Sequence, residues 1–572
     1  MAHLHTKHKK GRPYYYIREM ARIDGKPKVT NQIYLGTAEK IMKVFTEESK
    51  PDKIQTQEFG ALWVANEVDK KYDFASIVDG VIPRSQKEEG PSVGDYFVYA
   101  IFNRMVDSTS KRALCDWYNK TAIQIIRPTT ISDLSSERYW EKWNRVDSKH
   151  ITKIGELFFK KVWEIEKPES DCFLFDTTNY YTFMATHTKS DLAKRGKNKD
   201  GKSHLRQVGL ALLVGRGSRL PLYYHVYEGS THDSKLFAQI MDEMFGVIHG
   251  FGDTKQRLTV VFDKGMNSDD NFKVIDGNTQ IHFITSYSPY FAEEYARENI
   301  SKFEPLGINK NVILEGDDQG KDKMLAYRTK GDFWGKSRTV VVTYNPKTYR
   351  KQSYTFEKKL CEIREALLEM RTHVKNKDSQ WRNKKAIEER YVRLCQRYHV
   401  ATNYYQLEFD YENGDLNLSF RKDLYEVEKK TETLGKNIII TDNADWTTDD
   451  IVQGYLDRYE VEEDFRLSKD DDLVTVYPMR HWTDSKIRCH LLSCVVALTY
   501  LRIIERKLLA AGNKMSAKFT MKEMQSLDSC LVWNKDARKP ERMLETPTKT
   551  QAEVLKAFGH QIGQGGVLHP IK

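Results

Sequence analysis

Short apolar runs bounded by turn residues recur through the middle of the chain and predict the strands of a sheet. Five such runs occupy residues 172–176, 206–214, 220–228, 258–262 and 281–286. A continuous apolar run of this length is typical of a strand buried on both faces, because a half-exposed strand alternates apolar with polar residues. These runs predict the central sheet of an α/β protein.

Two of the predicted strands end in an aspartate. Cys172-Phe-Leu-Phe is followed by Asp176, and Leu258-Thr-Val-Val-Phe is followed by Asp263. Open α/β sheets usually place their sites at the carboxyl ends of strands, so both carboxylates are candidates for catalysis. Taken singly, either aspartate could equally be a turn or helix-capping residue.

A charged run between residues 455 and 469 predicts a helix with an unusual face. Tyr455, Arg458, Glu462 and Lys469 stand at positions i, i+3, i+7 and i+14. At about 100° per residue they fall within roughly 60° of one another around the helix. A carboxylate flanked by cations and a phenol suits metal and phosphate chemistry, although any charge-rich, solvated helix offers a similar surface.

Patterns before the first aspartate predict two further units. Residues 14–22 and 28–35 flank Asp24-Gly25, a strong hairpin signal, and a short helix follows them. Residues 57–165 are predicted to be mainly helical. This part contains five tryptophans, for which a position in the hydrophobic core is more common than a role in base stacking: Trp63, Trp117, Trp140, Trp143 and Trp163.

The 199 positions from Asp263 to Glu462 exceed what one strand and its loops need, which indicates an insertion. Apolar residues at helical spacing predict two amphipathic helices in it, around residues 360–370 and 387–394. Three strands are also expected, the last two joined by a turn at Asn413-Gly414: 338–344, 405–411 and 416–420.

The chain is expected to return to the core with a strand at residues 437–441. Thr447 then has the context of a helix cap for the Glu462 helix. The apolar stretch Leu491 to Leu501 is too short to span a bilayer and predicts a buried helix packed behind the Glu462 helix.

The residues around the three acids resemble the DDE transposases of bacterial insertion sequences, in particular the group with a Tyr-x2-Arg-x3-Glu-x6-Lys signature. Asp176 stands in a Phe-Asp-Thr-Thr context typical of that group, and Asp263 in its Asp-basic-Gly-Met context. Glu462 follows Arg458 at the spacing of the third acid. The resemblance covers about residues 170–510.

Two further segments extend this resemblance. Gly229-Ser-Thr-His-Asp233 is similar to the family's turn between its third strand and first core helix. Asn103-Arg104 with Ser110-Lys111 resembles the helical part of one long-chain subgroup.

The resemblance implies a ribonuclease-H-like mixed sheet in which Asp176, Asp263 and Glu462 are the catalytic residues and metal ligands. Converging carboxylates repel one another unless cations neutralise them, and oxygen-only ligands favour Mg²⁺ or Mn²⁺ over zinc. Two ions per site would serve phosphoryl transfer. The resemblance also implies that Tyr455, Arg458 and Lys469 bind phosphates, and that flanking DNA is released through a hairpin.

Basic residues are concentrated in two segments. The chain has 91 Lys and Arg against 81 Asp and Glu, a net charge of +10. Residues 1–30 hold eight basic and two acidic residues, and residues 189–206 hold seven and two. Clustered cations predict contact with a polyanion such as double-stranded DNA, although a solvated surface is the alternative for any one of them. The chosen DNA-binding candidates are Lys9, Lys10, Arg12, Lys194, Arg195, Lys197 and Lys199.

Cysteine and histidine usage argues against a zinc site. None of the seven cysteines forms a Cys-x2-Cys pair, and the sixteen histidines show no ligand spacing with them. Reduced cysteines and the lack of an apolar signal region predict a cytoplasmic protein that does not enter a membrane. The resemblance implies that it is bacterial and associated with the nucleoid. Trp334 and Trp446 are candidates for base stacking, with a core position as the alternative for each.

These patterns divide the chain into six predicted parts. They are a small basic β-hairpin unit (1–50), a helical DNA-binding domain (51–168), the first part of the catalytic core (169–300), an inserted α+β domain (301–435), the second part of the core (436–512) and a C-terminal helical region (513–572).

The sequence therefore predicts an α/β multidomain transposase of an insertion sequence. It would bind terminal inverted repeats, cleave at the transposon ends and join 3′-OH ends to target DNA as a homodimer in the DNA complex. One alternative is a ribonuclease-H-fold nuclease or host-adopted derivative that does not transpose. The other is a DNA-binding regulator with an inactive site, against which the intact acidic set argues.

Overall fold

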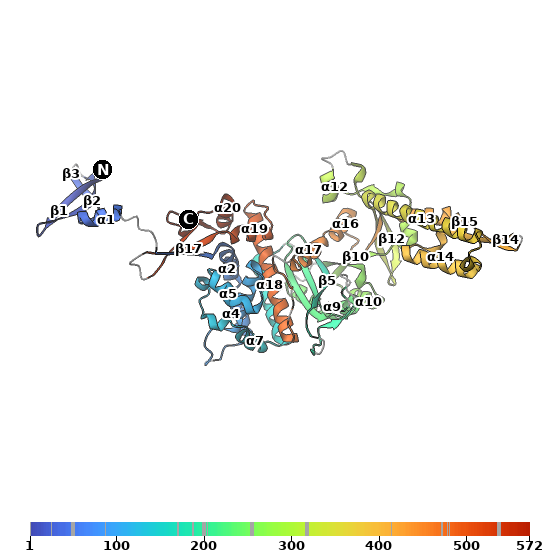
Figure 1. The fold of residues 1–572 in the computed structure, drawn as a ribbon, viewed down its shortest axis with the longest axis horizontal. Helices are drawn as coiled ribbons and strands as arrows, with labels where there is room; N and C mark the ends of the chain where they lie inside the picture. Colours follow the sequence, from blue (N-terminus) through green and yellow to red (C-terminus); the bar gives the residue numbers. More distant parts are fainter. Residues whose placement is uncertain are drawn as a thin grey trace.

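The structure is a computed structural model in which four parts follow one another along the long axis (Figure 1). They are a small β-unit at the amino terminus, a helical region, a large sheet and a helical insertion. The described residues are 2–23, 26–46, 52–85, 87–168, 171–185, 188–196, 202, 204–251, 257–314, 320–412, 414–470, 473–477, 479, 481–534 and 539–571.

The large sheet contains all five strands predicted from the apolar runs. Its central strands lie in the order β8-β7-β5-β9-β10, and β7 runs antiparallel to the other four. Their bounds are Cys172–Thr182 (β5), Arg206–Gly215 (β7), Pro221–Glu228 (β8), Leu258–Phe262 (β9) and Ile281–Tyr287 (β10). The two-residue β6 (Lys194–Arg195) pairs with the first two residues of β7, on the same edge that β8 occupies from Val208 onward.

The same sheet continues past β10 through the predicted core strand at residues 437–441 and then through strands from the predicted insertion. β16 (Lys436–Thr441) pairs with β10, and β13 (Lys336–Tyr344), β12 (Leu325–Phe333) and β11 (Glu304–Pro305) follow in that order. The placement of these last three strands in a separate α+β insertion is therefore corrected. Strand pairing between segments about a hundred residues apart leaves no periodic signal in the sequence, which is why the pattern did not reveal it.

The helical part of the insertion has a hydrophobic core of its own. α13 (Pro346–Lys375) and α14 (Lys384–Tyr398) confirm the two predicted helices, and the hairpin β14 (Tyr405–Glu412) and β15 (Asp415–Lys422) packs against α13. Leu360, Leu367 and Ile387 are buried in this second core. α15 (Leu424–Glu432) then leads back to β16.

Residues 60–166 are helical as predicted and share one continuous core with the sheet. The tryptophans of this region are buried or partly buried, which agrees with a packing role. The bounds of its longer helices are Gly60–Tyr72 (α2), Phe74–Val81 (α3), Val93–Val106 (α4), Ser136–Asn144 (α7) and Ser148–Glu166 (α8).

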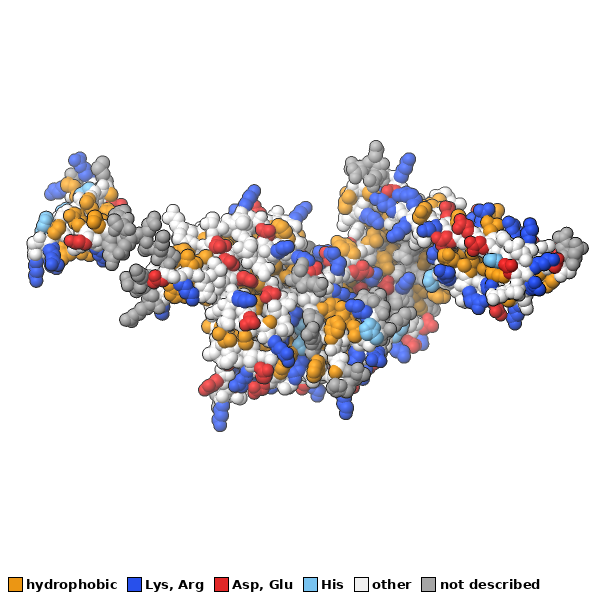
Figure 2. All heavy atoms as spheres, in the orientation of Figure 1, with side chains coloured by type: hydrophobic (Ala, Val, Ile, Leu, Met, Phe, Trp, Pro, Cys, Tyr) orange, Lys and Arg blue, Asp and Glu red, His pale blue; other side chains and the backbone are white. Residues whose placement is uncertain are grey.

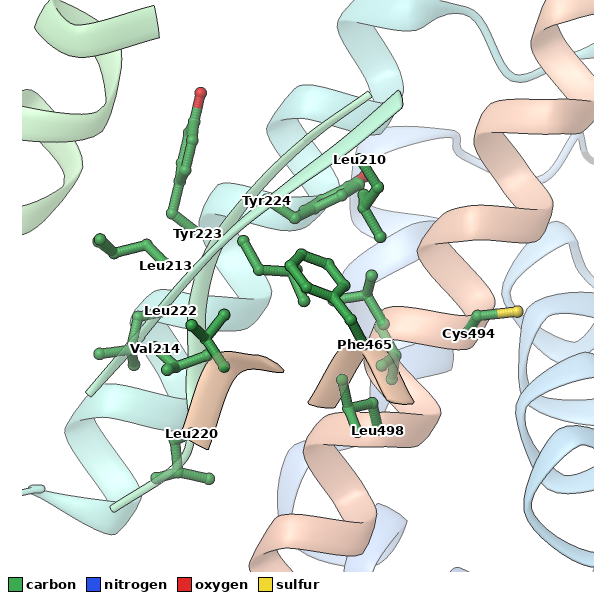
Figure 3. Packing of buried hydrophobic residues seen from close by; sticks show 14 of the residues in the cluster. Leu210, Leu213, Val214, Leu220, Leu222, Tyr223, Tyr224, Phe465, Cys494 and Leu498 are labelled. Carbon is green, nitrogen blue, oxygen red and sulfur yellow. The ribbon is translucent and has the colours of Figure 1, made fainter. Parts of the chain in front are cut away.

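The long helix α18 (Asp484–Ala510) lies between the helical region and the sheet. It is the one described helix that is long and apolar enough to cross a membrane, and 94% of its most apolar stretch is buried inside the protein. It packs behind the Glu462 helix, as predicted. Phe465 of that helix lies between Leu210 of β7 and Leu498 of α18 (Figure 3).

The two ends of the chain each form small sheets. β1 (Ala2–Lys9), β2 (Arg12–Ile23) and β3 (Lys26–Gly36) confirm the predicted hairpin, whose turn residues Asp24-Gly25 lie outside the described residues, and α1 (Ala38–Thr46) follows. β4 (Lys53–Glu58) pairs with β17 (Asp528–Trp533), which pairs with β18 (Glu541–Leu544).

The prediction of a helical C-terminal region was thus incomplete. α19 (Ala517–Gln525) and α20 (Lys549–Ala557) are present, but the region also holds β17, β18 and the short pair β19 (His560–Ile562) and β20 (Leu568–Pro570). These strands are three to six residues long, too short for a clear alternating pattern.

A buried basic cluster ties the helical region to the loop after the Glu462 helix. The Arg104 backbone and guanidinium bond Val474 and Thr475 of that loop, and the His490 Nε2–H donates to the Val476 carbonyl oxygen. Lys111 is buried beside the rings of Tyr139 and Trp143, with Nζ at 5.1 and 5.5 Å from their centroids. Arg104 and Lys111 of the motif therefore have structural roles: they stabilise the packing inside the protein.

The two histidines of this cluster make the fold sensitive to acid. The His481 and His490 rings lie 4.6 Å apart, and burial together with nearby Arg104 and Lys111 holds both pKa values well below 6.5. The unfolded chain gains these protons below about pH 6.5, whereas the folded chain does not. The free energy of unfolding should fall on acidification by up to about 1.4 kcal/mol per pH unit for each imidazole.

Replacing both histidines by glutamine should therefore flatten the pH dependence of stability. We expect the urea midpoint of His481→Gln/His490→Gln to change less than that of the unmodified protein between pH 7 and pH 5. His569→Gln, at an exposed histidine, is the control. An equal loss of stability in the double variant and the unmodified protein would show that these imidazoles do not govern the acid transition.

Candidate active site

Strand register brings the two aspartates together. Cys172–Leu174 of β5 pair in parallel with Thr259–Val261 of β9, and the same register continued by two residues places Asp176 level with Asp263. Neighbouring strands are about 4.8 Å apart, so the carboxylates share one edge of the sheet. β5 itself extends past Asp176 to Thr182, paired there with β7, so Asp176 lies within the strand and not at its end as predicted.

The third acid comes from a helix that is shorter than predicted. α16 (Thr448–Leu456), capped by Thr447, and α17 (Tyr459–Ser468) replace the single helix expected over residues 455–469. Asp457 forms an ion pair with Arg216 at 2.7 Å, and Arg458 turns inward as the residue before α17. Asp457, at the break, thus contacts the β7–β8 turn, a long-range neighbour that helical periodicity could not show.

Arg458 lies among the three predicted catalytic carboxylates. Its Nη1 is 3.7 Å from Asp176 Oδ2, and its Nη2 is 3.7 Å from Asp263 Oδ1 and 2.7 Å from Glu462 Oε1. Burial opposes the charge of the guanidinium, but the three carboxylates and Tyr455 outweigh this and raise the pKa of Arg458. Its side chain is 16% exposed, so one shielded cation balances three anions.

The structure separates Glu462 from the other acids of α17. Glu460 accepts a hydrogen bond from the Gly217 backbone N–H at 2.9 Å, and Glu463 forms an ion pair with Arg219 at 2.6 Å. Asp464 is buried against Arg502 of α18 at 2.6 Å. These three carboxylates hold α17 in place, which leaves Glu462, 50% exposed, facing the two aspartates.

The oxygen ligands of the site fit hard divalent cations, but the Arg458 guanidinium lies between them. Carboxylate oxygens from two strands and a helix are ligands that Mg²⁺ and Mn²⁺ prefer. Among the described residues, no group of three or more His, Cys, Asp or Glu side chains is close enough to hold a metal as it stands. The Arg458 guanidinium lies where the three carboxylates converge, so metal binding requires Arg458 to move aside.

The other two signature residues flank this centre. Tyr455, at the end of α16, lies with its hydroxyl beside Ser286 of β10, and burial raises its pKa. Lys469, directly after α17, has its Nζ 5.6 Å from the ring centroid of Tyr180 in β5. Tyr455 is close enough to Asp263 and Glu462 to interact with their charges, whereas the contact of Lys469 lies four residues beyond Asp176 on β5. The break at Asp457 puts Tyr455 on α16 and Glu462 on α17.

The basic segments lie farther from the acids. Lys194 and Arg195 form β6 beside the start of β7, about six residues along the sheet from Asp176, or roughly 20 Å. Lys197 and Lys199 lie outside the described residues. Lys9, Lys10 and Arg12 are exposed at the β1–β2 turn, in the unit that Figure 1 draws apart from the sheet.

The two tryptophans considered for base stacking occupy the alternative, packing positions. Trp334 stacks on Phe272 with ring centroids 3.5 Å apart, and Trp446 packs partly buried against the core, so both have packing roles. Exposed aromatics on the elements around the site include Tyr290 and Phe291, three and four residues after β10, and Tyr459 at the start of α17. Tyr290 and Phe291 belong to no motif, so no sequence pattern indicates them.

Asp233 is a second neighbour that the motifs did not assign to the site. It begins α9 (Asp233–Phe251) and accepts a hydrogen bond from the Thr177 hydroxyl at 3.1 Å. Thr177 directly follows Asp176, so Asp233 fixes the strand beside the first acid. In the sequence, the Gly229–Asp233 segment indicated a turn before a helix, but it gave no reason to place Asp233 at the active site.

Comparisons with known proteins point to one family. The family model for the transposase DDE domain matches residues 181–498, which contain Asp263 and Glu462 and begin five residues after Asp176. No curated protein matches the chain. Among solved structures, the cryo-EM structure of a piggyBac transposase synaptic complex with hairpin DNA is similar over 83% of this chain and 82% of that chain, with 8% identity and a TM-score of 0.39. A structural likeness of that degree supports no conclusion about this protein.

Removing Arg458 should expose the repulsion among the carboxylates. Without divalent cations, Arg458→Ala should lower the free energy of unfolding by about 2 kcal/mol, between the values for surface and buried ion pairs. Added Mg²⁺ should raise its melting temperature more than that of the unmodified protein, because binding to the folded state stabilises it.

Arg466→Ala is the matched control, since Arg466 is on the same helix, is 81% exposed and pairs with Glu463. It should change stability little. Thermal melting in EDTA and in Mg²⁺ measures both effects. If the Arg458→Ala protein is as stable in EDTA as the unmodified protein, Arg458 does not act as the shared cation of the three carboxylates.

Proposed function

The chain belongs to the family of transposase DDE domains, and from that membership we propose that it is the DNA transposase of an insertion sequence. It would bind terminal inverted repeats, cleave at the transposon ends and join the freed 3′-OH ends to target DNA. The observation that carries the proposal is the convergence of Asp176, Asp263 and Glu462 around one cation.

The strand order supports a ribonuclease-H-like core for this chemistry. The order β8-β7-β5-β9-β10, with only β7 reversed among the five, is the mixed arrangement that the sequence resemblance implied. It puts the first two acids on neighbouring parallel strands and leaves the third to a helix packed across them.

Each residue of the site has a distinct part in the proposed reaction. When bound, two Mg²⁺ ions would supply an activated water and stabilise the leaving 3′-oxygen. Asp176, Asp263 and Glu462 would hold them. Arg458, no longer required as counter-charge, could offer its forked donors to two phosphate oxygens of the DNA strand. Tyr455 and Lys469 would position the strand on either side.

The remaining parts of the chain would engage the DNA ends. We propose that residues 1–50 and the helical region 51–168, together with the segment 189–206, contact the terminal repeats, and that two protomers act together in the DNA complex. Because the tryptophans of this region are buried or partly buried, base reading would fall to its surface residues. The protein would act in the bacterial cytoplasm, associated with the nucleoid.

Two alternatives predict different products from the same assay. A nuclease of this fold would cleave but not join, and a regulator would bind DNA without cutting it. The Glu462 geometry favours an active site over a decayed one, because the three neighbouring acids of α17 are used in packing while Glu462 faces the aspartates.

Replacing any of the three acids should abolish chemistry and spare binding. Asp176→Ala, Asp263→Ala and Glu462→Ala should each lower Mg²⁺-dependent cleavage at least a thousandfold, about 4 kcal/mol in the barrier, while affinity for transposon-end DNA changes little. Nicking and strand joining are measured separately on labelled duplexes carrying the element's ends.

Glu463→Gln is the matched control, because Glu463 is adjacent on α17 but pairs with Arg219. It should retain cleavage. Cleavage by Glu462→Ala at the unmodified rate would reject the site assignment. Cleavage without any joining by the unmodified protein would favour the nuclease.

A further inference from the structure

A large basic groove lies where the helical insertion meets the sheet. It has a volume of about 1210 Å³ and is lined by the turn after β10, the first half of α13, residues 399–404 and α15. Six lysines and two glutamates, Glu293 and Glu426, line it. We call it the lysine groove, after Lys347, Lys351, Lys359, Lys429, Lys430 and Lys436.

The groove is on the same edge of the sheet as the catalytic acids. β10 and β13 both end there and β16 begins there, with Tyr287 opposite Ile438 and Tyr344 opposite Lys436. β5 and β9 run parallel to β10, so Asp176 and Asp263 face the same way. From β9 to β13 is three strand spacings, about 15 Å.

Among the described residues, two of these six lysines form ion pairs and a third donates to a backbone carbonyl oxygen. Lys429 pairs with Glu293 at 3.3 Å, Lys347 with Asp322 at 3.5 Å, and the Lys436 Nζ donates to the Glu298 carbonyl oxygen at 2.7 Å. Among the described residues, no ion pair is formed by the remaining three, which come from α13 and α15: Lys351, Lys359 and Lys430. Concentrated, uncompensated positive charge in a concave surface attracts a polyanion.

An exposed aromatic pair borders the groove on the side of the acids. Tyr290 and Phe291 follow β10 and are 77% and 72% exposed, with ring centroids 5.1 Å apart at 80°. Tyr290 also lines the groove. Exposed aromatics beside a row of lysines are the combination that holds a nucleic-acid backbone and its bases. Figure 2 shows Lys and Arg side chains gathered over the start of α13.

We propose that the lysine groove is a second DNA-binding surface, which holds the phosphate backbone of the duplex that runs from the catalytic acids toward the insertion. This inference rests on the proposed function for the identity of the polyanion. At about 3.4 Å per base pair, a duplex lying on the acids reaches α13 within roughly five base pairs. The helical insertion thereby clamps DNA on one side of the cut.

Salt dependence of DNA binding tests the proposal without knowledge of the terminal repeats. The probe is a fluorescent 30-base-pair duplex of mixed sequence, titrated with the full-length protein in EDTA over a range of NaCl concentrations. Lys351→Ala/Lys359→Ala/Lys430→Ala should flatten the slope of log K against log salt by about two to three units, because each phosphate contact contributes about 0.9.

The matched control removes the same charge from the outer surfaces of the insertion. Lys358→Ala/Lys375→Ala/Lys385→Ala changes three exposed lysines of α13 and α14 that do not line the groove. It should alter the slope by less than one unit, and thermal melting should show both triple variants folded. An unchanged slope in the groove variant, or equal losses in both variants, would overturn the proposal.

Two further arms separate this inference from the proposed function. Asp176→Ala should bind the duplex with an unmodified slope, and the groove variant should lose slope whether or not cleavage is ever observed. Replacing Tyr290 by Ala should lower affinity for a duplex with a single-stranded extension more than for a blunt one. Tighter binding of a polyglutamate peptide than of DNA would assign the groove to an acidic protein and reject DNA as its occupant.

Discussion

Repulsion among three carboxylates is the constraint around which the catalytic half of this protein is arranged. Asp176 and Asp263 are forced together by strand register, and Glu462 is brought to them on α17. Like charges so placed need a cation, and Arg458 supplies one from the same chain. The contacts of α17 with the β7–β8 turn and with α18 then hold both the third acid and its counter-charge in position.

Much of this architecture is visible in the sequence because it is local. Five apolar runs predicted the central strands within one or two residues at most ends, and motif context around Asp176, Asp263 and Glu462 selected the acids that the fold brings together. The break between α16 and α17 has no periodic signal in the sequence, and Asp457 at the break pairs with Arg216, some 240 residues earlier in the chain. The membership of β12 and β13 in the main sheet was hidden for the same reason.

The lysine groove shows the limit of reading charge along a chain. Its lysines come from α13, α15 and β16, and its aromatic neighbours from the turn after β10. Residues 347–359 are basic in the sequence, with five Lys and Arg against one Glu, but nothing along the chain shows that α15 and β16 add their lysines to the same groove. The segments that are conspicuously basic, at the amino terminus and around Lys194, lie away from the acids. Charged residues form a binding site where the fold brings separate segments together. Here that depends on the pairing of strands far apart in the sequence.

The points at which the insertion leaves and rejoins the sheet are next to each other. Tyr344, the last residue of β13, lies opposite Lys436, the first residue of β16, while the roughly ninety residues between them close around a core of their own. A tight turn could join the two strands and preserve the sheet. The insertion is thus attached to the sheet at a single place, between β13 and β16. Related chains could gain, lose or replace it without any change in the catalytic centre.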